Sequence, residues 1–212
     1  MDKYTKPNVA TSALITIDVQ NDFTLDNAPA CISGTKEAIP NIVTLLDAYR
    51  ARRLLIIHAI RIYLRNGSNV DLCRRQIIEE GKEVVAPETH GAELVHDLKP
   101  DNSKKQNSNY LLSGKFQQIG DNEYVMYKPR WGAFYKTQLE EFLKKRRVDT
   151  IVFSGCNFPN CPRTSIYEAS ERDFRVVLAT NAISQLYAKG EEEMNNIGVG
   201  LFTINEIQEF LH

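Results

Sequence analysis

The sequence predicts an α/β fold, a three-layer α/β/α sandwich built on a mostly parallel, Rossmann-like sheet. Short apolar runs rich in β-branched residues recur along the chain, and they are nearly continuous rather than alternating. That pattern is typical of strands covered on both faces, and amphipathic helical stretches lie between the runs. Strands that alternate with helices indicate a parallel sheet. The 212 residues suit one hydrophobic core, so we predict a single domain over residues 1–212.

The individual elements follow from these patterns. The predicted strands are, in chain order, residues 13–17, 54–58, 124–127, 150–153 and 176–179. The predicted helices are residues 39–53, 134–147, 164–173, 191–200 and 204–211. Residues 60–122 are less regular, with helices expected at 69–80 and 92–98 and a loop at 101–109. A connection of this length is expected to cover or line a site.

Composition excludes several classes of protein. The chain has 26 basic and 27 acidic residues, a formal net charge of -1, and this gives no basic excess for binding nucleic acid. No apolar run approaches membrane-spanning length, so no membrane partner is expected. The first residues lack the apolar stretch of a signal peptide, and the four cysteines form no CxxC pair. We therefore expect a reduced, cytoplasmic protein.

Three reactive side chains are predicted to meet at one edge of the sheet, because ligands of such sheets bind beyond the carboxyl ends of the strands. Asp18 ends the first predicted strand, and Lys128 follows the third, held extended by Pro129. Cys161 precedes Pro162, which favours the first turn of a helix. Taken singly, each residue has a plain alternative role: a turn-forming aspartate, a solvated lysine and a buried structural cysteine.

Together these residues suit nucleophilic catalysis. A helix N-terminus and a nearby lysine favour a thiolate at Cys161, and a carboxylate can accept its proton. The N–H groups of a helix start can also stabilise an oxyanion. A thiol, a proton acceptor and a cation are the groups that such a reaction requires.

Three segments resemble the motifs of one family, the isochorismatase-like cysteine hydrolases. They are Ile17 to Phe23 (Ile-Asp-Val-Gln-Asn-Asp-Phe), Lys128 to Phe134 (Lys-Pro-Arg-Trp-Gly-Ala-Phe) and Gly155 to Ala169 around the cysteine. Their order and spacing match, and the resemblance extends over residues 11 to 203. It implies that Asp18, Lys128 and Cys161 form a catalytic triad.

The resemblance also implies finer features of the site. A cis peptide is expected between Cys156 and Asn157, and the backbone N–H groups of Asn157 and Cys161 are expected to form the oxyanion hole. The implied reaction cleaves a C–N bond of a small amide, carbamoyl or ureido compound through a thioester. A homodimer or homotetramer is implied as well. The chain departs from the family near the nucleophile, where Phe158-Pro159-Asn160-Cys161-Pro162 replaces Thr-Asp-x-Cys-Val, and this difference bears on the substrate more than on the mechanism.

Six residues near the motifs are candidate substrate contacts. They are Phe23, Trp131 and Phe158, which could form an apolar wall, and Arg61, Tyr63 and Arg130, which lie just past strand ends. An arginine there could hold a carboxylate with two parallel hydrogen bonds, which would favour N-carbamoyl or ureido acids. Core packing of the tryptophan and surface ion pairs of the arginines are equally good interpretations.

No metal or other cofactor is expected. The four histidines, at positions 58, 90, 96 and 212, are scattered and lack the Asp-x-His pattern of the nicotinamidase branch. His58 is expected to be a buried structural histidine in a strand. Two rival functions remain: an isochorismatase that hydrolyses a vinyl ether, against which the retained cysteine argues, and a catalytically silent binding or scaffold protein on the same fold.

Overall fold

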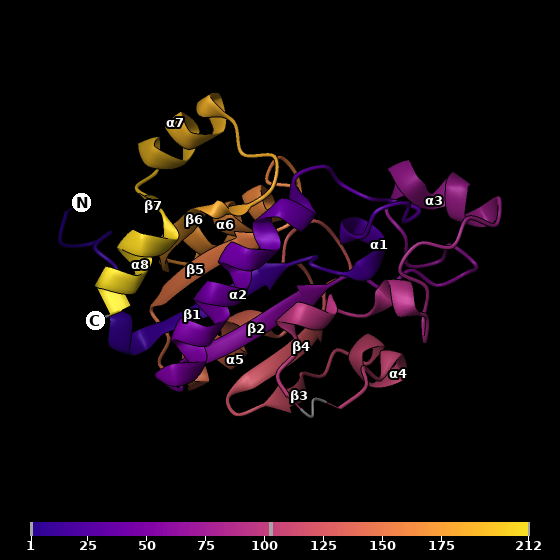
Figure 1. Ribbon diagram of the computed structural model, residues 1–212, viewed down its shortest axis with the longest axis horizontal. Coiled ribbons are helices and arrows are strands. Elements are labelled where there is room, and N and C mark those ends of the chain that lie inside the picture. Colours follow the sequence, from indigo (N-terminus) through magenta and orange to yellow (C-terminus); the bar gives the residue numbers. More distant parts are fainter. Residues whose placement is uncertain (1, 102–103, 212) are drawn as a thin grey trace.

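The computed structural model describes residues 2–101 and 104–211, and it confirms the predicted α/β fold (Figure 1). Seven strands of the described residues form one sheet in the order β3-β4-β2-β1-β5-β6-β7. Their bounds are β1 Ser12–Ile17, β2 Leu55–Ile60, β3 Gln117–Gly120, β4 Glu123–Tyr127, β5 Thr150–Gly155, β6 Arg175–Ile183 and β7 Gly200–Phe202. Only β3 runs antiparallel to its neighbour, β4, among these strands.

β1 is the central strand of the sheet and lies parallel to β2 and β5. Ile17 at its end is level with Ala59 of β2 and Gly155 of β5. All six residues in each of these three strands are buried, as their continuous apolar sequences predict. Because parallel strands end at the same edge, the residues that follow β1, β4 and β5 come together there.

Helices cover both faces of the sheet. The helices are α1 Asn21–Thr24, α2 Thr35–Ala51, α3 Leu72–Glu79, α4 Ser108–Leu112, α5 Leu139–Lys145, α6 Cys161–Ser170, α7 Ala188–Asn196 and α8 Ile204–Leu211. Helices α2 and α8 pack on one face, and α5, α6 and α7 contribute to the core on the other. None of the described helices is long and apolar enough to cross a membrane.

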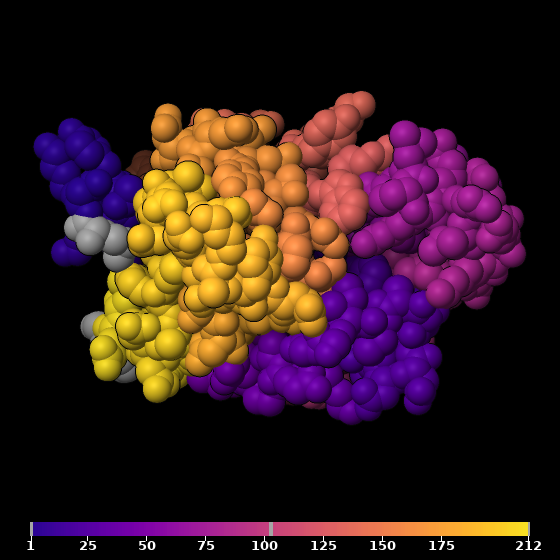
Figure 2. All heavy atoms as spheres, turned by 90° about the horizontal axis from the view of Figure 1, so that it is seen from above, coloured from indigo at the N-terminus to yellow at the C-terminus, as the bar shows by residue number. Residues whose placement is uncertain are grey.

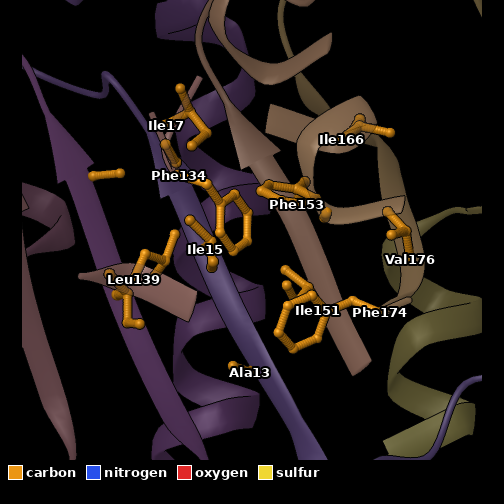
Figure 3. Packing of buried hydrophobic residues seen from close by; sticks show 14 of the residues in the cluster. Ala13, Ile15, Ile17, Phe134, Leu139, Ile151, Phe153, Ile166, Phe174 and Val176 are labelled. Carbon is orange, nitrogen blue, oxygen red and sulfur yellow. The ribbon is translucent and has the colours of Figure 1, made fainter. Parts of the chain in front are cut away.

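The strands divide their side chains between two core clusters. In β1, Ala13, Ile15 and Ile17 point toward α5 and α6, whereas Leu14 points toward α2 (Figure 3). Successive side chains of a strand point to opposite faces, so a fully apolar strand supplies both clusters. Burying one such isoleucine stabilises the fold by about 1.5–3 kcal/mol.

Left-handed residues explain where helix bounds differ from the prediction. Lys136, with φ 51°, excludes helix at that point, so α5 begins only at Leu139 rather than at 134. Gly34, with φ 82°, precedes α2, which begins at Thr35 instead of 39. Gly198, with φ 79°, follows the end of α7, which runs over 188–196 instead of 191–200. Strands β3 and β7 are too short, at four and three residues, to be predicted from periodicity.

The irregular segment between β2 and β4 contains little helix. Its helix α3 falls inside the predicted range 69–80, but the helix expected at 92–98 is absent. Two 3₁₀ turns, His90–Ala92 and His96–Leu98, occur there instead, separated by Leu94, which forms an antiparallel bridge with Gln20. The loop expected at 101–109 gives way to α4 at Ser108, and its residues 102–103 lie outside the described residues.

Candidate active site

Asp18 follows β1 directly and turns the chain away from the sheet. Its backbone is left-handed, with φ 55°, a conformation that non-glycine residues seldom adopt. The turn is fixed by two hydrogen bonds: the Asp18 N–H donates to the Ala59 carbonyl at 2.9 Å, and the Gln20 N–H donates to the Asp18 carbonyl at 2.9 Å. The residue is 5% exposed, so its carboxylate lies in a nearly closed environment.

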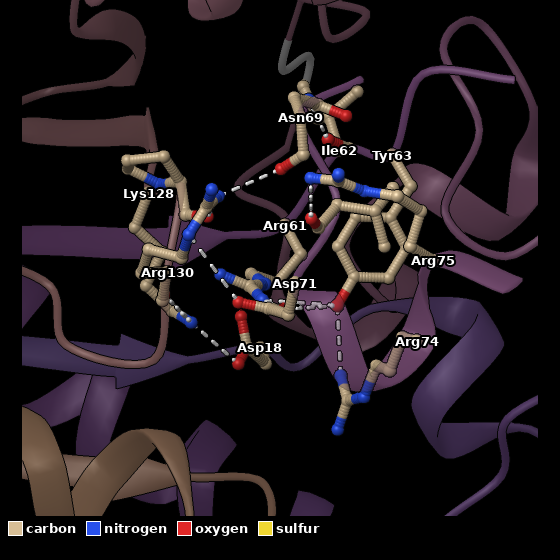
Figure 4. Close-up of polar contacts among 12 residues, drawn as sticks. Asp18, Arg61, Ile62, Tyr63, Asn69, Asp71, Arg74, Arg75, Lys128 and Arg130 are labelled. Atoms are coloured by element: carbon tan, nitrogen blue, oxygen red, sulfur yellow. Dashed lines mark hydrogen bonds and ion pairs between the residues drawn. The ribbon is translucent and has the colours of Figure 1, made fainter. Parts of the chain in front are cut away.

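Lys128 forms a buried ion pair with Asp18. Its Nζ lies 2.9 Å from Asp18 Oδ2, and the side chains are 0% and 6% exposed (Figure 4). The Lys128 N–H donates to the Ile60 carbonyl at 2.9 Å, which extends the pairing of β4 with β2 to this residue. Among the described residues, Asp18 Oδ1 has no hydrogen-bond partner, so one carboxylate oxygen remains able to accept a proton.

Cys161 is the first residue of α6, and the turn that leads to it relies on left-handed backbone. Gly155 has φ 122° and Asn157 has φ 63°. A Cβ at position 155 would collide with the backbone of Ile17, so only glycine fits there. The expected cis peptide between Cys156 and Asn157 is wrong, since the described residues contain no cis bond. The left-handed residues bend the chain in its place.

Burial decides the ionisation of Cys161. The thiol is 5% exposed, and burial, together with the negative charge of Asp18, raises its pKa to about 11. The charges of Lys128 and Arg61 lower the pKa, but less. Burial thus opposes the thiolate that the helix start and the cations favour, so ionisation of this thiol calls for a base.

The two expected oxyanion donors differ in whether another protein group already accepts their hydrogen bond. The Asn157 N–H donates to Ser184 Oγ at 2.7 Å, and the same oxygen accepts a hydrogen bond from Thr35 Oγ1 at 2.9 Å. The Cys161 N–H, at the first position of α6, has no acceptor among the described residues. It is the donor already free to bind a ligand.

Asp18 and Cys161 line one pocket, together with a set of mostly apolar residues. The other lining residues are Phe23, Ile32, Arg74, Cys156 and Asn157. The cavity volume is about 10 Å³, which is room for about one water molecule. Phe23 was a predicted contact, whereas Ile32, Arg74 and Cys156 were not. A substrate can enter only if part of this lining moves.

The predicted substrate contacts Arg61 and Tyr63 lie beside the pocket but already have partners. Arg61 is 1% exposed and is ion-paired with Asp71, another buried residue. Its Nη2 also donates to Tyr63 Oη at 3.1 Å, and its guanidinium stacks over that ring at 5.2 Å. The third such contact, Arg130, donates to the Asn69 carbonyl at 2.9 Å and lies 4.0 Å from Asp71 (Figure 4).

The two remaining aromatic candidates lie apart from the pocket lining. Phe158 is fully buried in the core and packs edge-on against Tyr187, with ring centroids 5.7 Å apart. Trp131 is half-buried, with the guanidinium of Arg74 over its ring at 5.1 Å. Among the described residues of the pocket lining, Arg74 contacts the Trp131 ring. The sequence analysis missed Arg74 because nothing in the sequence shows which face of α3 turns inward.

His58 takes the structural role expected of it. It is fully buried in β2, with Nδ1 2.7 Å from Thr16 Oγ1 and Nε2 2.8 Å from Glu123 Oε1. Within residues 2–101 and 104–211, no group of three or more His, Cys, Asp or Glu side chains could hold a metal ion.

Known proteins match the chain over nearly its full length. The family model for the isochorismatase domain matches residues 12–108 and 112–199. The chain is 31% identical over 208 residues to an Arabidopsis thaliana protein named "probable inactive nicotinamidase", covering 94% of this chain and 96% of that one. It is 25% identical over 176 residues to N-carbamoylsarcosine amidase of an Arthrobacter species, covering 81% of this chain but only 58% of that protein.

A solved structure agrees with the fold. The isochorismatase family protein of Desulfovibrio vulgaris superposes with a TM-score of 0.81 at 31% identity, covering 95% of this chain and 98% of that one. The order of the three motifs, the parallel sheet and the family match point to the same conclusion. The chain belongs to the isochorismatase family.

Proposed function

We propose that this protein is a cysteine hydrolase that cleaves the C–N bond of a small amide, carbamoyl or ureido compound and releases ammonia or an amine. The observation that carries the proposal is the buried Lys128–Asp18 pair beside the pocket in which Cys161 begins a helix. The similarity to N-carbamoylsarcosine amidase supports a carbamoyl or amide substrate.

Asp18 is the base of the proposed reaction. Its Oδ1, which has no partner among the described residues, accepts the proton of the Cys161 thiol as the sulfur attacks the carbonyl carbon. The need for this step follows from the thiol pKa of about 11, which leaves little thiolate at neutral pH. Lys128 holds Oδ2 at 2.9 Å and so fixes the orientation of the carboxylate.

The remaining steps use the same groups. The Cys161 N–H stabilises the oxyanion, and the Asn157 N–H joins it when it leaves Ser184; such a donor contributes roughly 3 kcal/mol in comparable sites. Asp18 passes its proton to the leaving nitrogen, the C–N bond breaks, and an acyl thioester of Cys161 remains. Water then attacks the thioester with Asp18 as base, which releases the acid and restores the thiol.

The substrate is a small molecule in this proposal, and the protein acts as a cytoplasmic homodimer or homotetramer. The assembly and the location rest on the family resemblance and on composition. A second candidate function is a binding protein without turnover. It is favoured by the small volume of the pocket, about 10 Å³, and by the word "inactive" in the name of the Arabidopsis relative. The isochorismatase reaction is less favoured because the thiol is retained.

An ammonia-release screen tests the proposal. Purified protein is incubated with a panel of small primary amides, N-carbamoyl compounds and ureides, and ammonia is measured. We expect turnover of at least one class, and loss of that turnover in Cys161→Ala. The matched control is Cys73→Ala, which removes an exposed cysteine outside the pocket lining and should retain activity. Release that persists in Cys161→Ala, or no release from any compound, would contradict the proposal.

A further inference from the structure

The surroundings of the pocket carry more positive than negative charge. Figure 4 shows the side chains concerned, which converge from α3, from the residue before it and from the segments that follow β1, β2 and β4. The cations are Arg61, Arg74, Lys128 and Arg130, and the carboxylates are Asp18 and Asp71. These four cations outnumber the two carboxylates, and Arg75, which Figure 4 also draws, adds a positive charge whose Nη2 donates to the Val70 carbonyl at 3.3 Å. Charges in a region of low dielectric are costly unless they are compensated.

Both carboxylates form ion pairs with cations other than Arg74. Asp18 pairs with Lys128 at 2.9 Å, and Asp71 pairs with Arg61 inside the protein. Arg130 is 38% exposed at its side chain and lies near Asp71, so it is partly compensated and partly solvated. Of the four cations, Arg74 therefore remains without a carboxylate partner among these pairs.

Arg74 has no carboxylate partner among the described residues. Its Nη1 donates to the neutral Tyr63 hydroxyl at 2.9 Å, and its guanidinium lies over the Trp131 ring at 5.1 Å. Of the four cations, only Arg74 lines the pocket that holds Cys161. The nearby Asp18 carboxylate also attracts its charge, but that carboxylate is already paired with Lys128.

We propose that Arg74 is a specificity-determining residue, and that it binds a carboxylate carried by the substrate at the end remote from the scissile carbonyl. The proposed hydrolysis supplies the identity of the scissile group, so the inference rests on that function. A guanidinium can bind a carboxylate through two parallel N–H···O bonds, which fixes the orientation of the substrate as well as binding it. The bound anion would also balance the excess charge.

The position of Arg74 also suggests how so small a pocket can admit a substrate. Arg74 belongs to α3, of which only Ile78 is buried, while Leu72 is 82% exposed. Figure 2 shows α3 and its neighbours as a lobe at one end of the molecule. A helix with so few buried contacts opens at low cost. When the substrate carboxylate replaces Tyr63 as the partner of Arg74, the guanidinium moves and the pocket gains room.

Trp131 provides a direct readout, since it is the only tryptophan and lies under Arg74. In the Cys161→Ala protein, Trp131 fluorescence is titrated with two matched pairs: succinamate against succinamide, and N-carbamoylglycine against its neutral amide. We expect the anionic member of a pair to bind roughly 10- to 100-fold more tightly, the effect of one charge-assisted contact.

Three variants in the Cys161→Ala background separate a binding role from a structural one. Arg74→Gln should remove the preference for the anion. Arg74→Lys should keep part of it, because a lysine has the charge but cannot form two parallel hydrogen bonds to a carboxylate. Arg65→Gln is the matched control; Arg65 lies in the same segment, is exposed and pairs with Glu83. It should bind both members as the parent does. In protein with Cys161, Arg74→Gln should lower kcat/KM for the anionic amide much more than for its neutral counterpart.

The inference fails if the two members of each pair bind equally, if neither binds, or if Arg74→Gln leaves the preference intact. It also fails if inorganic phosphate competes as well as the carboxylate amides do, since the site would then hold any anion. A preference that depends on Arg74, together with no ammonia release from any amide, would support the anion site and refute the hydrolase. Equal ammonia release from neutral and anionic amides would support the hydrolase and refute the anion site.

Discussion

The buried ion pair between Lys128 and Asp18 should be costly to break. Neither side chain is more than 6% exposed, and the two atoms are 2.9 Å apart. Removing one partner of a buried pair leaves an uncompensated charge, which costs about 3–5 kcal/mol. Typical domains are stable by only about 5–15 kcal/mol. Lys128→Met should therefore unfold at a much lower urea concentration than the parent protein.

Equilibrium urea unfolding, followed by circular dichroism, measures the effect. The matched control is Lys144→Met, which breaks an exposed pair with Glu140 and should cost less than about 1 kcal/mol. The double variant Lys128→Met/Asp18→Asn should lose less stability than the sum of the two single variants, because the second change removes the stranded charge. A free energy of unfolding for Lys128→Met within about 1 kcal/mol of the parent would refute the reasoning.

Three further outcomes follow from burial. Glu123 is buried, which raises its pKa, but hydrogen bonds from Arg50 and His58 lower it more, to about 2. The folded pKa lies below the usual 4.5, so this carboxylate stabilises the fold above pH 4.5, and the stabilisation disappears as the pH falls toward 2. In acid titrations of stability, the advantage over Glu123→Gln should shrink by about 3 kcal/mol across that window, and a constant difference would contradict this. Because the pKa of Cys161 is about 11, its alkylation by iodoacetamide should be slow at pH 7 and accelerate up to pH 11; a rate that levels off below pH 8 would show an ionised thiol instead. Ile15→Ala, in the central strand at 0% exposure, should lower the free energy of unfolding by about 2–5 kcal/mol in urea, and a loss under 1 kcal/mol would mean that the core collapses around the gap.

Much of the sheet could be predicted because its signal is local. The strands around the centre are nearly continuous apolar runs, as burial on both faces favours. The meeting of Asp18, Lys128 and Cys161 could also be predicted, since each follows a parallel strand or begins the helix after one.

Other features depend on contacts between distant segments and leave no local signal. Arg74 and Asp71 reach the site only because the segment around α3 folds back over the ends of the strands. Burial raises the pKa of the Cys161 thiol, and the sequence around the helix start does not show that burial. The predicted start of α5 was wrong because Lys136, a non-glycine residue, takes a left-handed conformation that the sequence does not indicate.

The proposed reaction passes through a covalent intermediate on the sulfur of Cys161, and intact mass spectrometry tests for that intermediate most directly. The protein is mixed with an amide that releases ammonia, the reaction is stopped in acid within its first turnover, and the protein is weighed and digested. The proposed mechanism predicts a mass increase equal to the acyl group, located on the peptide that contains Cys161 and absent from Cys161→Ala. Turnover without that adduct, or an acyl group on any other residue, would contradict it.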